Sequence, residues 1–500
     1  MVQIHDNSEP NRVADFFANK TIFITGGSGF LGKVLIEKLL RSCTQLKKLY
    51  VLMRPKKGRT ATERLHQIFD GPLYDLLKKQ HGKDIFDKVE VIIGDIEAQD
   101  LGFSAEDRKK LTEEVEIIYH SAATVQFDED FRKSILLNVR GAKLLLALAK
   151  ECKNLVAYCH LSTAYCQEQE EVLYEKCYPP PADPHRVIEM CEWMSDTTLD
   201  SIAQKIRGSH ANTYTFTKAL GEALVAEQMD NLPVIIQRPS AVIPIWIEPL
   251  PGWTDNLNGP TGLLLGAGKG VIRTMYGRSD YFADYCPVDS TANCLICSTY
   301  DYATYKKRRV YNFTASDEVK VTFKELIDVG RRIVINELPF DWTLWYPGGG
   351  ITHSRIRHAL IFFFFQLVPA IFIDAILFVF GFKPIMVRVQ KKILRGYKIF
   401  EYYSNRKWDF RKDNIAVTRS LMNKKENQIF KIDPEGFVLR DYIYTCILGS
   451  RRYLLKEKDE NIPVAKRRLK VLWAIDKMYK CILVAGILYV LFKMFIMPFV

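Results

Sequence analysis

A tyrosine and a lysine lie four residues apart at Tyr214 and Lys218, in the segment YTFTK. Residues with this spacing lie on one face of a helix, one above the other. An ammonium group beside a phenol favours the phenolate, so we expect Lys218 to lower the pKa of Tyr214 from its ordinary value of about 10. A phenol tuned in this way donates a proton near neutral pH. The pair therefore predicts a proton donor at Tyr214.

Two hydroxyl residues, Ser162 and Thr163, follow a strand-like run from Leu155 to Leu161. Either hydroxyl could hold a substrate oxygen beside the proton donor. Because a Tyr-x-x-x-Lys spacing is common by chance, this prediction of catalysis depends on what surrounds it in the fold.

A glycine-rich turn near the start of the chain supplies that context. A short β-branched and aromatic run, Thr21 to Thr25, leads into TGGSGFLG at residues 25–32, and a helical pattern and a second strand-like run follow. This strand–turn–helix–strand order predicts a dinucleotide-binding loop. Gly26 would permit the tight turn, Gly29 the close approach of a pyrophosphate, and Gly32 the close packing of helix on strand.

The second strand-like run, Lys48 to Met53, ends without the acidic residue that usually binds a free ribose 2′-hydroxyl. Arg54 follows directly, and Lys56, Lys57 and Arg59 come soon after. A guanidinium group can form paired hydrogen bonds with a phosphate. The sequence therefore predicts NADPH rather than NADH.

Further strand-like runs alternate with helical segments, of which Phe131 to Lys150 is the clearest. This order predicts an α/β fold with a doubly wound parallel sheet of the Rossmann type. Ligands of such sheets bind at the carboxyl ends of the strands. We expect the cofactor to contact the residues there and in the glycine turn: Thr25, Gly26, Gly29, Phe30, Leu31, Gly32, Arg54, Asp95, Ile96, Ala122, Ala123, Thr124, Pro239 and Val242.

Two apolar runs, Leu360 to Phe382 and Cys481 to Val500, reach the length of a membrane-spanning helix. Asp374 would be costly at the middle of a bilayer, and Pro369 could mark the bend of a hairpin that enters the membrane and returns. We expect a monotopic or re-entrant first run and a C-terminal anchor. A buried core helix is the alternative for each.

The charge is unevenly distributed over the 500 residues, whose net charge is +12. Residues 383–480 carry 25 Lys and Arg against 11 Asp and Glu, so the rest of the chain is nearly neutral. Residues 462–480 alternate apolar and basic side chains at helical spacing, which suits an anionic headgroup surface. Because apolar runs flank the basic stretch, we expect a membrane partner and no nucleic acid.

Composition narrows the class of protein. Hydrophobic residues make up 48% of the chain, which excludes a wholly disordered, collagen-like or small disulfide-stapled protein. The N-terminal segment is charged early, so we expect no secretory signal. The eleven scattered cysteines are interpreted as reduced cytosolic thiols, and Cys294 and Cys297 lack the second pair that a zinc site needs. We predict no metal.

These motifs together resemble the extended short-chain dehydrogenase/reductases and, among them, the fatty acyl-CoA reductases. The similarity covers most of the chain. The matching stretches are TGGSGFLG at 25–32, HSAATVQFDE at 120–129, HLSTAYC at 160–166, YTFTK at 214–218, QRPSAVIP at 237–244, EPLPGWTDNLNGPTGLLLGAGKG at 248–270 and DYCPVD at 284–289. Residues 396–423 resemble the family's C-terminal domain, including Trp408, Phe410 and Asn414.

The resemblance implies specific roles. Tyr214 would be the acid, Lys218 would support it and hold the nicotinamide ribose, and Thr163 would stabilise the oxyanion with Ser162 beside it. It also implies that this chain is an NADPH-dependent oxidoreductase. Its substrate would be long-chain acyl-CoA, reduced through a thiohemiacetal and an aldehyde to a primary alcohol, with release of CoA. Cys166 stands where many relatives of the wider group have glycine, and Cys286 has no assigned role.

The expected organisation is a tail at 1–15, a catalytic domain at 16–355, a membrane-associated segment at 360–382, a basic mainly helical domain at 383–460, a basic amphipathic segment at 461–480 and an anchor at 481–500. We expect the endoplasmic reticulum membrane with the catalytic domain in the cytosol, or else a peroxisomal membrane or lipid droplet. The alternatives are a reductase of the hydroxysteroid dehydrogenase type, an enzyme that stops at the aldehyde, and a non-catalytic membrane-tethered binding protein.

Overall fold

The structure, a computed structural model, describes residues 9–56, 58–127, 129–315 and 318–495. The chain forms two compact units, each built from three stretches of sequence. Unit 1 contains Met1–Pro251, Asp284–Lys320 and Lys407–Gly436. Unit 2 contains Gly252–Ala283, Val321–Arg406 and Phe437–Val500.

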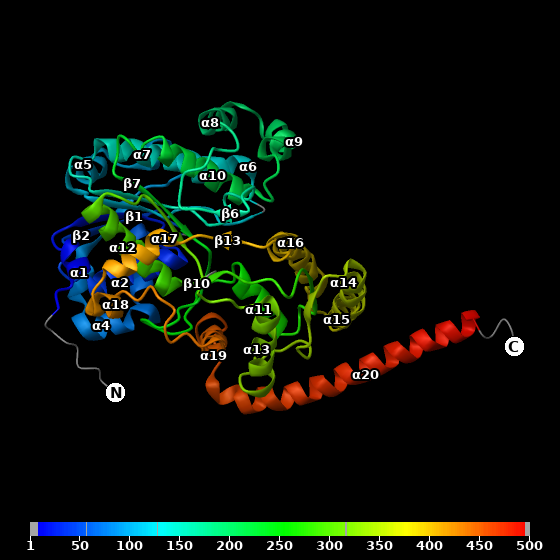
Figure 1. Cartoon of the computed structure of the whole chain (residues 1–500). Helices are drawn as coiled ribbons and strands as arrows, with labels where there is room; N and C mark the ends of the chain where they lie inside the picture. The colour runs from blue at the N-terminus through cyan, green and yellow to red at the C-terminus, as the bar shows by residue number, and fades with distance from the viewer. Residues whose placement is uncertain (1–8, 57, 128, 316–317, 496–500) are drawn as a thin grey trace. The chain divides into compact units, whose positions relative to one another are not determined.

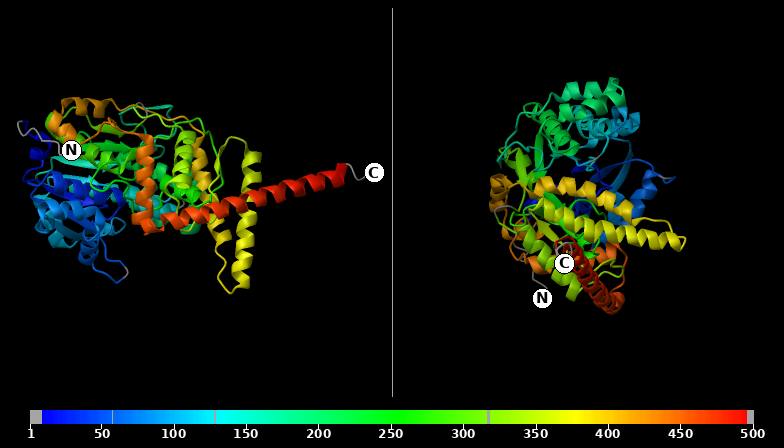
Figure 2. Two further views of the ribbon diagram at one scale, coloured as in Figure 1. Left: turned by 90° about the horizontal axis from the view of Figure 1, so that it is seen from below. Right: turned by 90° about the vertical axis from the view of Figure 1, so that its right-hand side faces the viewer.

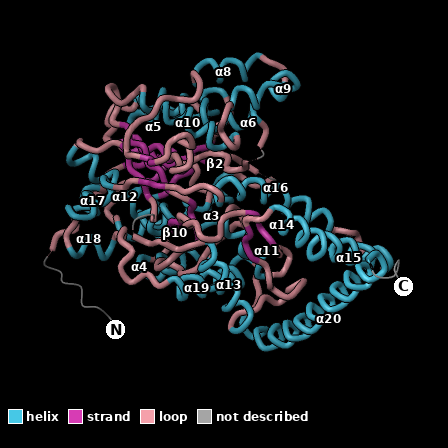
Figure 3. The backbone as a smooth tube through the Cα atoms, turned by 45° about the vertical axis from the view of Figure 1, so that its right-hand side comes forward, coloured by secondary structure: helices cyan, strands magenta, loops and turns pink. Residues whose placement is uncertain are grey.

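Unit 1 is built around a seven-stranded parallel sheet with the strand order β11-β7-β5-β4-β1-β2-β3, which confirms the predicted doubly wound fold (Figure 3). The strands are β1 (Thr21–Thr25), β2 (Lys48–Met53), β3 (Val89–Ile93), β4 (Ile117–His120), β5 (Ala157–Leu161), β7 (Val234–Pro239) and β11 (Val310–Phe313). The central strands are buried along almost their whole length, because helices cover both faces of the sheet.

The strand order reverses between β1 and β4, where Thr25 pairs with His120. The glycine turn after β1 and the loop after β4 therefore leave the sheet side by side, at the place where such folds bind ligands. Helices α5 (Ala105–Glu114), α7 (Gly141–Glu151) and α10 (Thr213–Ala226) lie on one side of the sheet. Helices α2 (Phe30–Ser42) and α12 (Val288–Tyr305) lie on the other (Figure 1).

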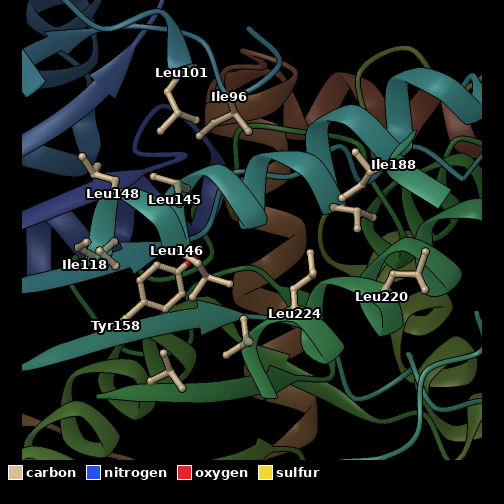
Figure 4. Close-up of a cluster of buried hydrophobic side chains, with 14 of the residues drawn as sticks. Ile96, Leu101, Ile118, Leu145, Leu146, Leu148, Tyr158, Ile188, Leu220 and Leu224 are labelled. Atoms are coloured by element: carbon tan, nitrogen blue, oxygen red, sulfur yellow. The ribbon is translucent and has the colours of Figure 1, made fainter. Parts of the chain in front are cut away.

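The main core of unit 1 lies between the sheet and the α7–α10 layer. Side chains from β4, β5, α7 and α10 meet there, including those of Ile118, Leu145, Tyr158 and Leu220 (Figure 4). The helix predicted over 131–150 is present as α6 (Phe131–Ile135), a π-helical turn η4 (Leu136–Arg140) and α7. Such π-turns often occur at functional sites.

The other elements of unit 1 are short. They are α1 (Arg12–Phe16), α3 (Ala61–Phe69), η1 (Pro72–Tyr74), α4 (Asp75–His81), η2 (Asp84–Lys88), η3 (Gln99–Gly102), β6 (Val172–Leu173), α8 (Pro184–Trp193), α9 (Asp196–Arg207), β8 (Ala241–Ile243), β10 (Tyr285–Pro287), β13 (Asp409–Phe410), α17 (Asp413–Leu421) and α18 (Lys424–Ile429).

Unit 2 is mainly helical, with one two-stranded parallel pair formed by β9 and β12. Its elements are α11 (Pro260–Gly268), β9 (Thr274–Tyr276), α13 (Phe323–Asn336), β12 (Gly350–Thr352), α14 (Arg355–Phe362), η5 (Phe363–Leu367), α15 (Val368–Val379), α16 (Met386–Ser404), α19 (Leu439–Gly449), η6 (Ser450–Leu454), η7 (Asp459–Asn461) and α20 (Ile462–Phe495).

The first apolar run forms one arm of a helical hairpin, drawn in yellow in Figure 2. The arm from α14 to α15 is the helix of the described chain that is long and apolar enough to cross a membrane. The chain does not turn at Pro369, as the sequence suggested, but at Gly381, whose φ is +77°. Pro369 lies at the N-terminal end of α15, where its missing N–H is tolerated.

Asp374 stabilises the hairpin. Its carboxylate accepts hydrogen bonds from the backbone N–H groups of Ile385, Met386 and Val387, at 2.8, 2.8 and 2.9 Å. These N–H groups begin α16 and have no partner within that helix. The acidic residue that seemed out of place in an apolar run is therefore the cap of the returning arm.

The basic amphipathic segment and the second apolar run form one continuous helix, α20, of which the structure describes residues up to 495. Asp476 attaches its first half to unit 2, because this buried carboxylate bonds to Arg273 at 3.0 Å and to the indole of Trp345 at 2.7 Å. From Ile482 to Met494 most side chains are exposed. Residues 496–500 of the predicted anchor lie outside the described residues.

Candidate active site

The turn after β1 has the geometry of a dinucleotide-binding loop. Gly26 has a φ of +75°, and a Cβ there would lie 2.7 Å from the backbone nitrogen of Ala122. Gly32 opens α2, and a Cβ on it would lie 2.3 Å from the carbonyl oxygen of Gly26. The tight turn at Gly26 and the close packing at Gly32 are confirmed, since neither place has room for a side chain.

Gly29 is the N-cap residue of α2 and makes no side-chain capping bond. A Cβ there would meet the oxygen of Gly26 at 3.1 Å, so this glycine is less tightly enclosed than Gly32. Half-buried Phe30 and Leu31 lie in the first turn of α2, at the positive end of the helix dipole. This turn, closed to side chains at Gly26 and Gly32 and facing a helix N-terminus, fits a pyrophosphate.

Thr25 connects this loop to the neighbouring strand end instead of facing outward. It is fully buried, and its hydroxyl bonds to Nδ1 of His120 at 2.9 Å and accepts from the N–H of Ala122 at 3.2 Å. Ser121 donates to the carbonyl oxygen of Thr25 at 2.6 Å. Thr25 therefore holds the β4 loop against the glycine turn.

Arg54 is exposed at the end of β2 and pairs with Asp95, at the end of β3, over 2.7 Å. Two of the predicted cofactor residues thus contact each other. The side chain of Ile96 is buried in the core. Lys56 and Arg59 are exposed, and the guanidinium of Arg59 bonds to Gln67. Lys57 lies outside the described residues.

Asn138, which the sequence did not single out, joins the β4 loop to the helix that carries Tyr214 and Lys218. Its amide oxygen accepts from the N–H of Thr124 at 2.9 Å. Its amide nitrogen donates to the carbonyl of Thr124 at 3.2 Å and to the hydroxyl of Thr217 at 2.9 Å. Asn138 is buried in the π-turn η4, and no local pattern in the sequence marks it. Ala122 and Ala123 lie half-buried in the same loop.

The predicted catalytic side chains converge at the carboxyl end of β5. The hydroxyl of Thr163 lies close enough to the phenol of Tyr214 to lower its pKa. Thr163 lies two residues beyond β5, and Tyr214 lies in the first turn of α10, which begins with an Asn212 cap. Lys218, one turn further along α10, donates its Nζ to the carbonyl oxygen of Leu161 at 2.7 Å. The spacing therefore brings the phenol and the ammonium to one helix face.

Burial has the largest effect on the pKa values of Tyr214 and Lys218. It raises the pKa of Tyr214, and the hydroxyl of Thr163 offsets only part of this rise. The expectation that Lys218 lowers the phenol pKa is therefore wrong, because desolvation of the phenolate is the largest effect and it raises the pKa. Burial also lowers the pKa of Lys218 to about 8. Tyr214 thus holds its proton at neutral pH.

Ser162 contacts a different group from Thr163. Its hydroxyl bonds to Cys166 at 3.7 Å and to the carboxylate of Glu222. Glu222 forms a buried, bidentate ion pair with Arg238, with distances of 2.8 and 2.6 Å. Ser162 therefore lies in a structural network, and Cys166 takes part in it by donating to Glu222 at 3.1 Å.

Two buried histidines lie behind the site, and the sequence analysis missed both. The rings of His120 and His160 are 5.4 Å apart on adjacent strands. Burial and the charge of Lys218 lower the pKa of His120 to about 3 and that of His160 well below its ordinary value. Both rings are therefore neutral. They open the matching stretches HSAATVQFDE and HLSTAYC, but nothing in their type or spacing assigned them a role.

The strand end after β7 completes the site. The carbonyl oxygen of Pro239 accepts from the N–H of Ala164 at 2.9 Å, and the hydroxyl of Thr163 lies 3.4 Å from it. Val242 lies half-buried in β8, where it pairs with Cys286 of β10. Cys286, to which the sequence assigned no role, is a buried residue of β10, and its sulfur accepts a hydrogen bond from the hydroxyl of Thr291 at 3.2 Å.

No group of three or more His, Cys, Asp or Glu among the described residues is arranged to hold a metal ion. The arrangement instead offers a proton-donating phenol, a second hydroxyl and a cation beside a dinucleotide loop. Such a site can add a hydride to a carbonyl and protonate the resulting oxyanion.

Comparisons with known proteins agree with this geometry. Residues 24–295 and 365–457 match two family descriptions, both named Male sterility protein. The chain is 35% identical to Fatty acyl-CoA reductase 2 of Bos taurus, over 92% of this chain and 89% of the relative. It is 34% identical to Fatty acyl-CoA reductase wat of Drosophila melanogaster, over 99% of this chain and 96% of the relative.

Among solved structures, the reductase domain of a non-ribosomal peptide synthetase from Mycobacterium tuberculosis is similar, with a TM-score of 0.58 and 19% identity. That match covers 90% of this chain and 96% of the solved one. The terminal reductase domain of the myxalamid pathway gives a TM-score of 0.56 at 18% identity, with 87% and 91% covered. At these identities the likeness shows the fold.

Proposed function

The chain belongs to the fatty acyl-CoA reductase family, and from that premise we propose that it reduces long-chain fatty acyl-CoA to the primary alcohol with NADPH. The observation that carries the proposal is that Thr163, two residues beyond β5, and Tyr214, in the first turn of α10, converge at the strand ends beside the dinucleotide loop. Two hydroxyl groups that converge on one point can both donate to a carbonyl oxygen placed there.

When bound, NADPH supplies the hydride that the carbonyl carbon accepts. Thr163 and Tyr214 stabilise the oxyanion that forms, and Tyr214 donates its proton to give a thiohemiacetal. Lys218 supports the negative charge left on the Tyr214 oxygen. Collapse of the thiohemiacetal returns that proton to Tyr214 and breaks the C–S bond, so that CoA leaves and an aldehyde remains. The same two hydroxyls then serve the reduction of the aldehyde, for which a second NADPH would supply the second hydride, and Tyr214, after protonating the alkoxide, regains its proton from solvent.

The residues proposed to hold the cofactor form a path across the strand ends. The N–H groups at the start of α2 would bind the pyrophosphate, and Lys218 would bind the nicotinamide ribose. Arg54, exposed at the end of β2, would bind the 2′-phosphate. The 2.7 Å pair between Arg54 and Asp95 holds the guanidinium at that place but also competes with a phosphate.

We propose that unit 2 binds the membrane through the tip of its hairpin. Gln366 fixes the base of the hairpin, because this buried amide accepts from the N–H groups of Arg273 and Thr274 at 2.8 and 3.1 Å. The exposed apolar part runs from Ile371 to Phe382, about 18 Å at the rise of an α-helix. This length is shorter than the roughly 30 Å of a hydrocarbon core, so it fits insertion into one leaflet.

The positive charge of α16 also supports binding to a membrane. Helix α16 returns from the tip with exposed Arg388, Lys391, Lys392 and Arg395. These cations would lie at the headgroup level of an anionic membrane. The exposed apolar half of α20 would serve as an anchor, and an acyl chain would partition into the same bilayer. We propose the endoplasmic reticulum, with the active site on the cytosolic side; a peroxisomal membrane or a lipid droplet is the alternative.

The test is to incubate membranes that contain the protein with palmitoyl- or stearoyl-CoA and NADPH. Free thiol is measured against time, and the lipid products are separated by gas chromatography. We expect equal amounts of CoA and primary alcohol. An aldehyde as the final product would reduce the proposal to its first step, and the absence of both CoA release and alcohol would overturn it.

A further inference from the structure

A short segment from the C-terminal third of the chain, Trp408–Asn414, is bonded firmly into unit 1; we call it the strap. Its strand β13 pairs in parallel with β6, and Arg411 donates its N–H to the carbonyl oxygen of Leu173 at 2.9 Å. Asn312 of β11 donates its side-chain amide to the oxygen of Arg411 at 2.7 Å. The strap is therefore fixed to the edge strand of the sheet.

The end of the strap is held as tightly as its middle. The backbone N–H of Asn414 donates to Glu175 at 2.6 Å, and its side chain donates to the carbonyl oxygen of Val310 at 2.8 Å. Lys412 donates to the oxygen of Thr314 at 3.1 Å. These bonds leave the strap little freedom to shift, so the side chains that it presents have defined positions.

The strap presents two aromatic rings to the turn that carries Thr163. Trp408 meets the ring of Tyr165 edge to face, with centroids 5.0 Å apart, and Phe410 meets the same ring at 5.4 Å. Phe410 is 1% exposed and packs in one cluster with Ala164. The two residues that directly follow Thr163 are thus both covered by the strap.

Tyr165 in turn contacts the proposed catalytic hydroxyl. Its backbone N–H lies 3.3 Å from Oγ1 of Thr163, and its phenol donates to the carbonyl oxygen of Asp284 at 3.2 Å. The hydroxyl of Thr163 in turn acts on the phenol of Tyr214, whose pKa it lowers against the effect of burial. A continuous series of contacts therefore leads from Trp408 through Tyr165 and Thr163 to the proton donor.

We propose that Trp408 is a positioning residue for Thr163, a role that rests on the proposed function of that hydroxyl. Trp408 fixes the ring of Tyr165, and the backbone of Tyr165 fixes the Thr163 oxygen at the point where the oxyanion forms. A catalytic group displaced by about 1 Å can cost on the order of 100-fold in rate. The strap thereby lets a segment of the C-terminal third of the chain position a catalytic group of unit 1.

The experiment is a double-mutant cycle in the full-length protein in membranes, with Trp408→Ala, Thr163→Val and the double variant. We expect Thr163→Val to lower kcat by about 100-fold or more, as removal of an oxyanion donor does. Trp408→Ala should lower kcat by tenfold to 100-fold with little change in KM. The double variant should be no more than about threefold slower than Thr163→Val, because Trp408 acts through Thr163.

Three further measurements separate positioning from general stability. Trp408→Phe should regain most of the lost kcat because it retains the edge-to-face contact. NADPH binding, followed by fluorescence, and the thermal midpoint of unfolding should stay close to wild type in Trp408→Phe and in Trp408→Leu. Trp193→Ala, which removes a tryptophan that is 69% exposed in α8 of unit 1, is the matched control and should leave kcat unchanged.

The outcomes are distinct. Independent effects of Trp408 and Thr163 that multiply in the double variant would overturn the positioning role while leaving the proposed function standing. A normal kcat in Trp408→Ala would do the same. Unchanged activity in Thr163→Val would instead remove the oxyanion role from the proposed function, and the inference would fail with it.

Discussion

Burial, and not the neighbouring ammonium, dominates the pKa of Tyr214. The YxxxK spacing correctly placed both groups on one helix face, but the sequence could not show that the phenol would be enclosed. The Nζ of Lys218 donates a hydrogen bond to the carbonyl oxygen of Leu161 at 2.7 Å. The phenol therefore keeps its proton at neutral pH, which suits a proton donor, while the lysine is the group whose charge changes closest to neutrality.

The pH dependence of activity should report Lys218. Burial lowers its pKa to about 8, so its ammonium loses its proton as the pH rises through that value. If the cation supports charge on the Tyr214 oxygen, kcat should fall above about pH 8. Lys218→Arg should move this fall to higher pH, since a guanidinium stays charged. A fall at pH 8 that persists in Lys218→Arg would exclude Lys218 as its cause.

Arg54 should determine the choice between NADPH and NADH. Arg54→Ala should weaken NADPH binding by about tenfold to 100-fold, because a charge-assisted bond to phosphate contributes roughly 1.5–3 kcal/mol. NADH binding should change much less. Arg59→Ala is the control, since the guanidinium of Arg59 bonds to Gln67. Equal weakening of both cofactors in Arg54→Ala would contradict the assignment, and titration calorimetry measures each affinity.

At the scale of elements, the predicted strands agree closely with the structure, because apolar runs that end in glycine or hydroxyl clusters are strong local signals. Thr21–Thr25 and Lys48–Met53 match β1 and β2 residue for residue. The π-turn η4 could not be predicted in this way. Its geometry depends on the contacts that Asn138 makes with Thr124 and Thr217, far away in sequence.

The glycine turn gives a direct test at this scale. Gly32→Ala would place a Cβ 2.3 Å from the oxygen of Gly26, so the turn or the helix must shift. We expect the affinity for NADPH to fall at least tenfold, and stability to fall by about 1–3 kcal/mol, as overpacking does. Gly350→Ala, with nothing within 4 Å of its Cβ, should change neither. Normal NADPH binding in Gly32→Ala would contradict the tight cradle.

The hairpin was expected from its composition, but its turn was placed at the wrong residue. Pro369 attracts attention in a sequence, whereas the turn depends on a left-handed glycine, Gly381, and on the cap that Asp374 provides eleven to thirteen residues before its partners. Capping over that distance leaves no local pattern.

Insertion of the hairpin tip can be measured by replacing Phe380 with a photo-crosslinking phenylalanine analogue. Phe380 is 73% exposed, and burial of such a side chain in lipid contributes about 1.5–3 kcal/mol. We expect abundant lipid adducts at position 380 in native membranes and several-fold fewer when Trp193 is replaced instead. Equal labelling at the two positions would contradict insertion.

At the scale of the whole molecule, the sequence located the basic charge but not the path of the chain. Residues 407–436 return to unit 1, although the basic stretch around them otherwise belongs to unit 2. This return depends on partners such as Glu175 and Asn312, which no periodicity reveals. The resemblance identified Trp408, Phe410 and Asn414 as notable, and the structure gives them contacts near the catalytic turn.

The central claim is that one site performs two reductions, with Tyr214 as the proton donor in both. Its most direct test uses long-chain acyl-CoA and NADPH deuterated at the transferred position of the nicotinamide, with mass analysis of the alcohol. We predict two deuterium atoms on the carbinol carbon, and a loss of about 100-fold to 10,000-fold in rate for Tyr214→Phe with NADPH binding retained. Alcohol without deuterium, or a fully active Tyr214→Phe protein, would contradict the account.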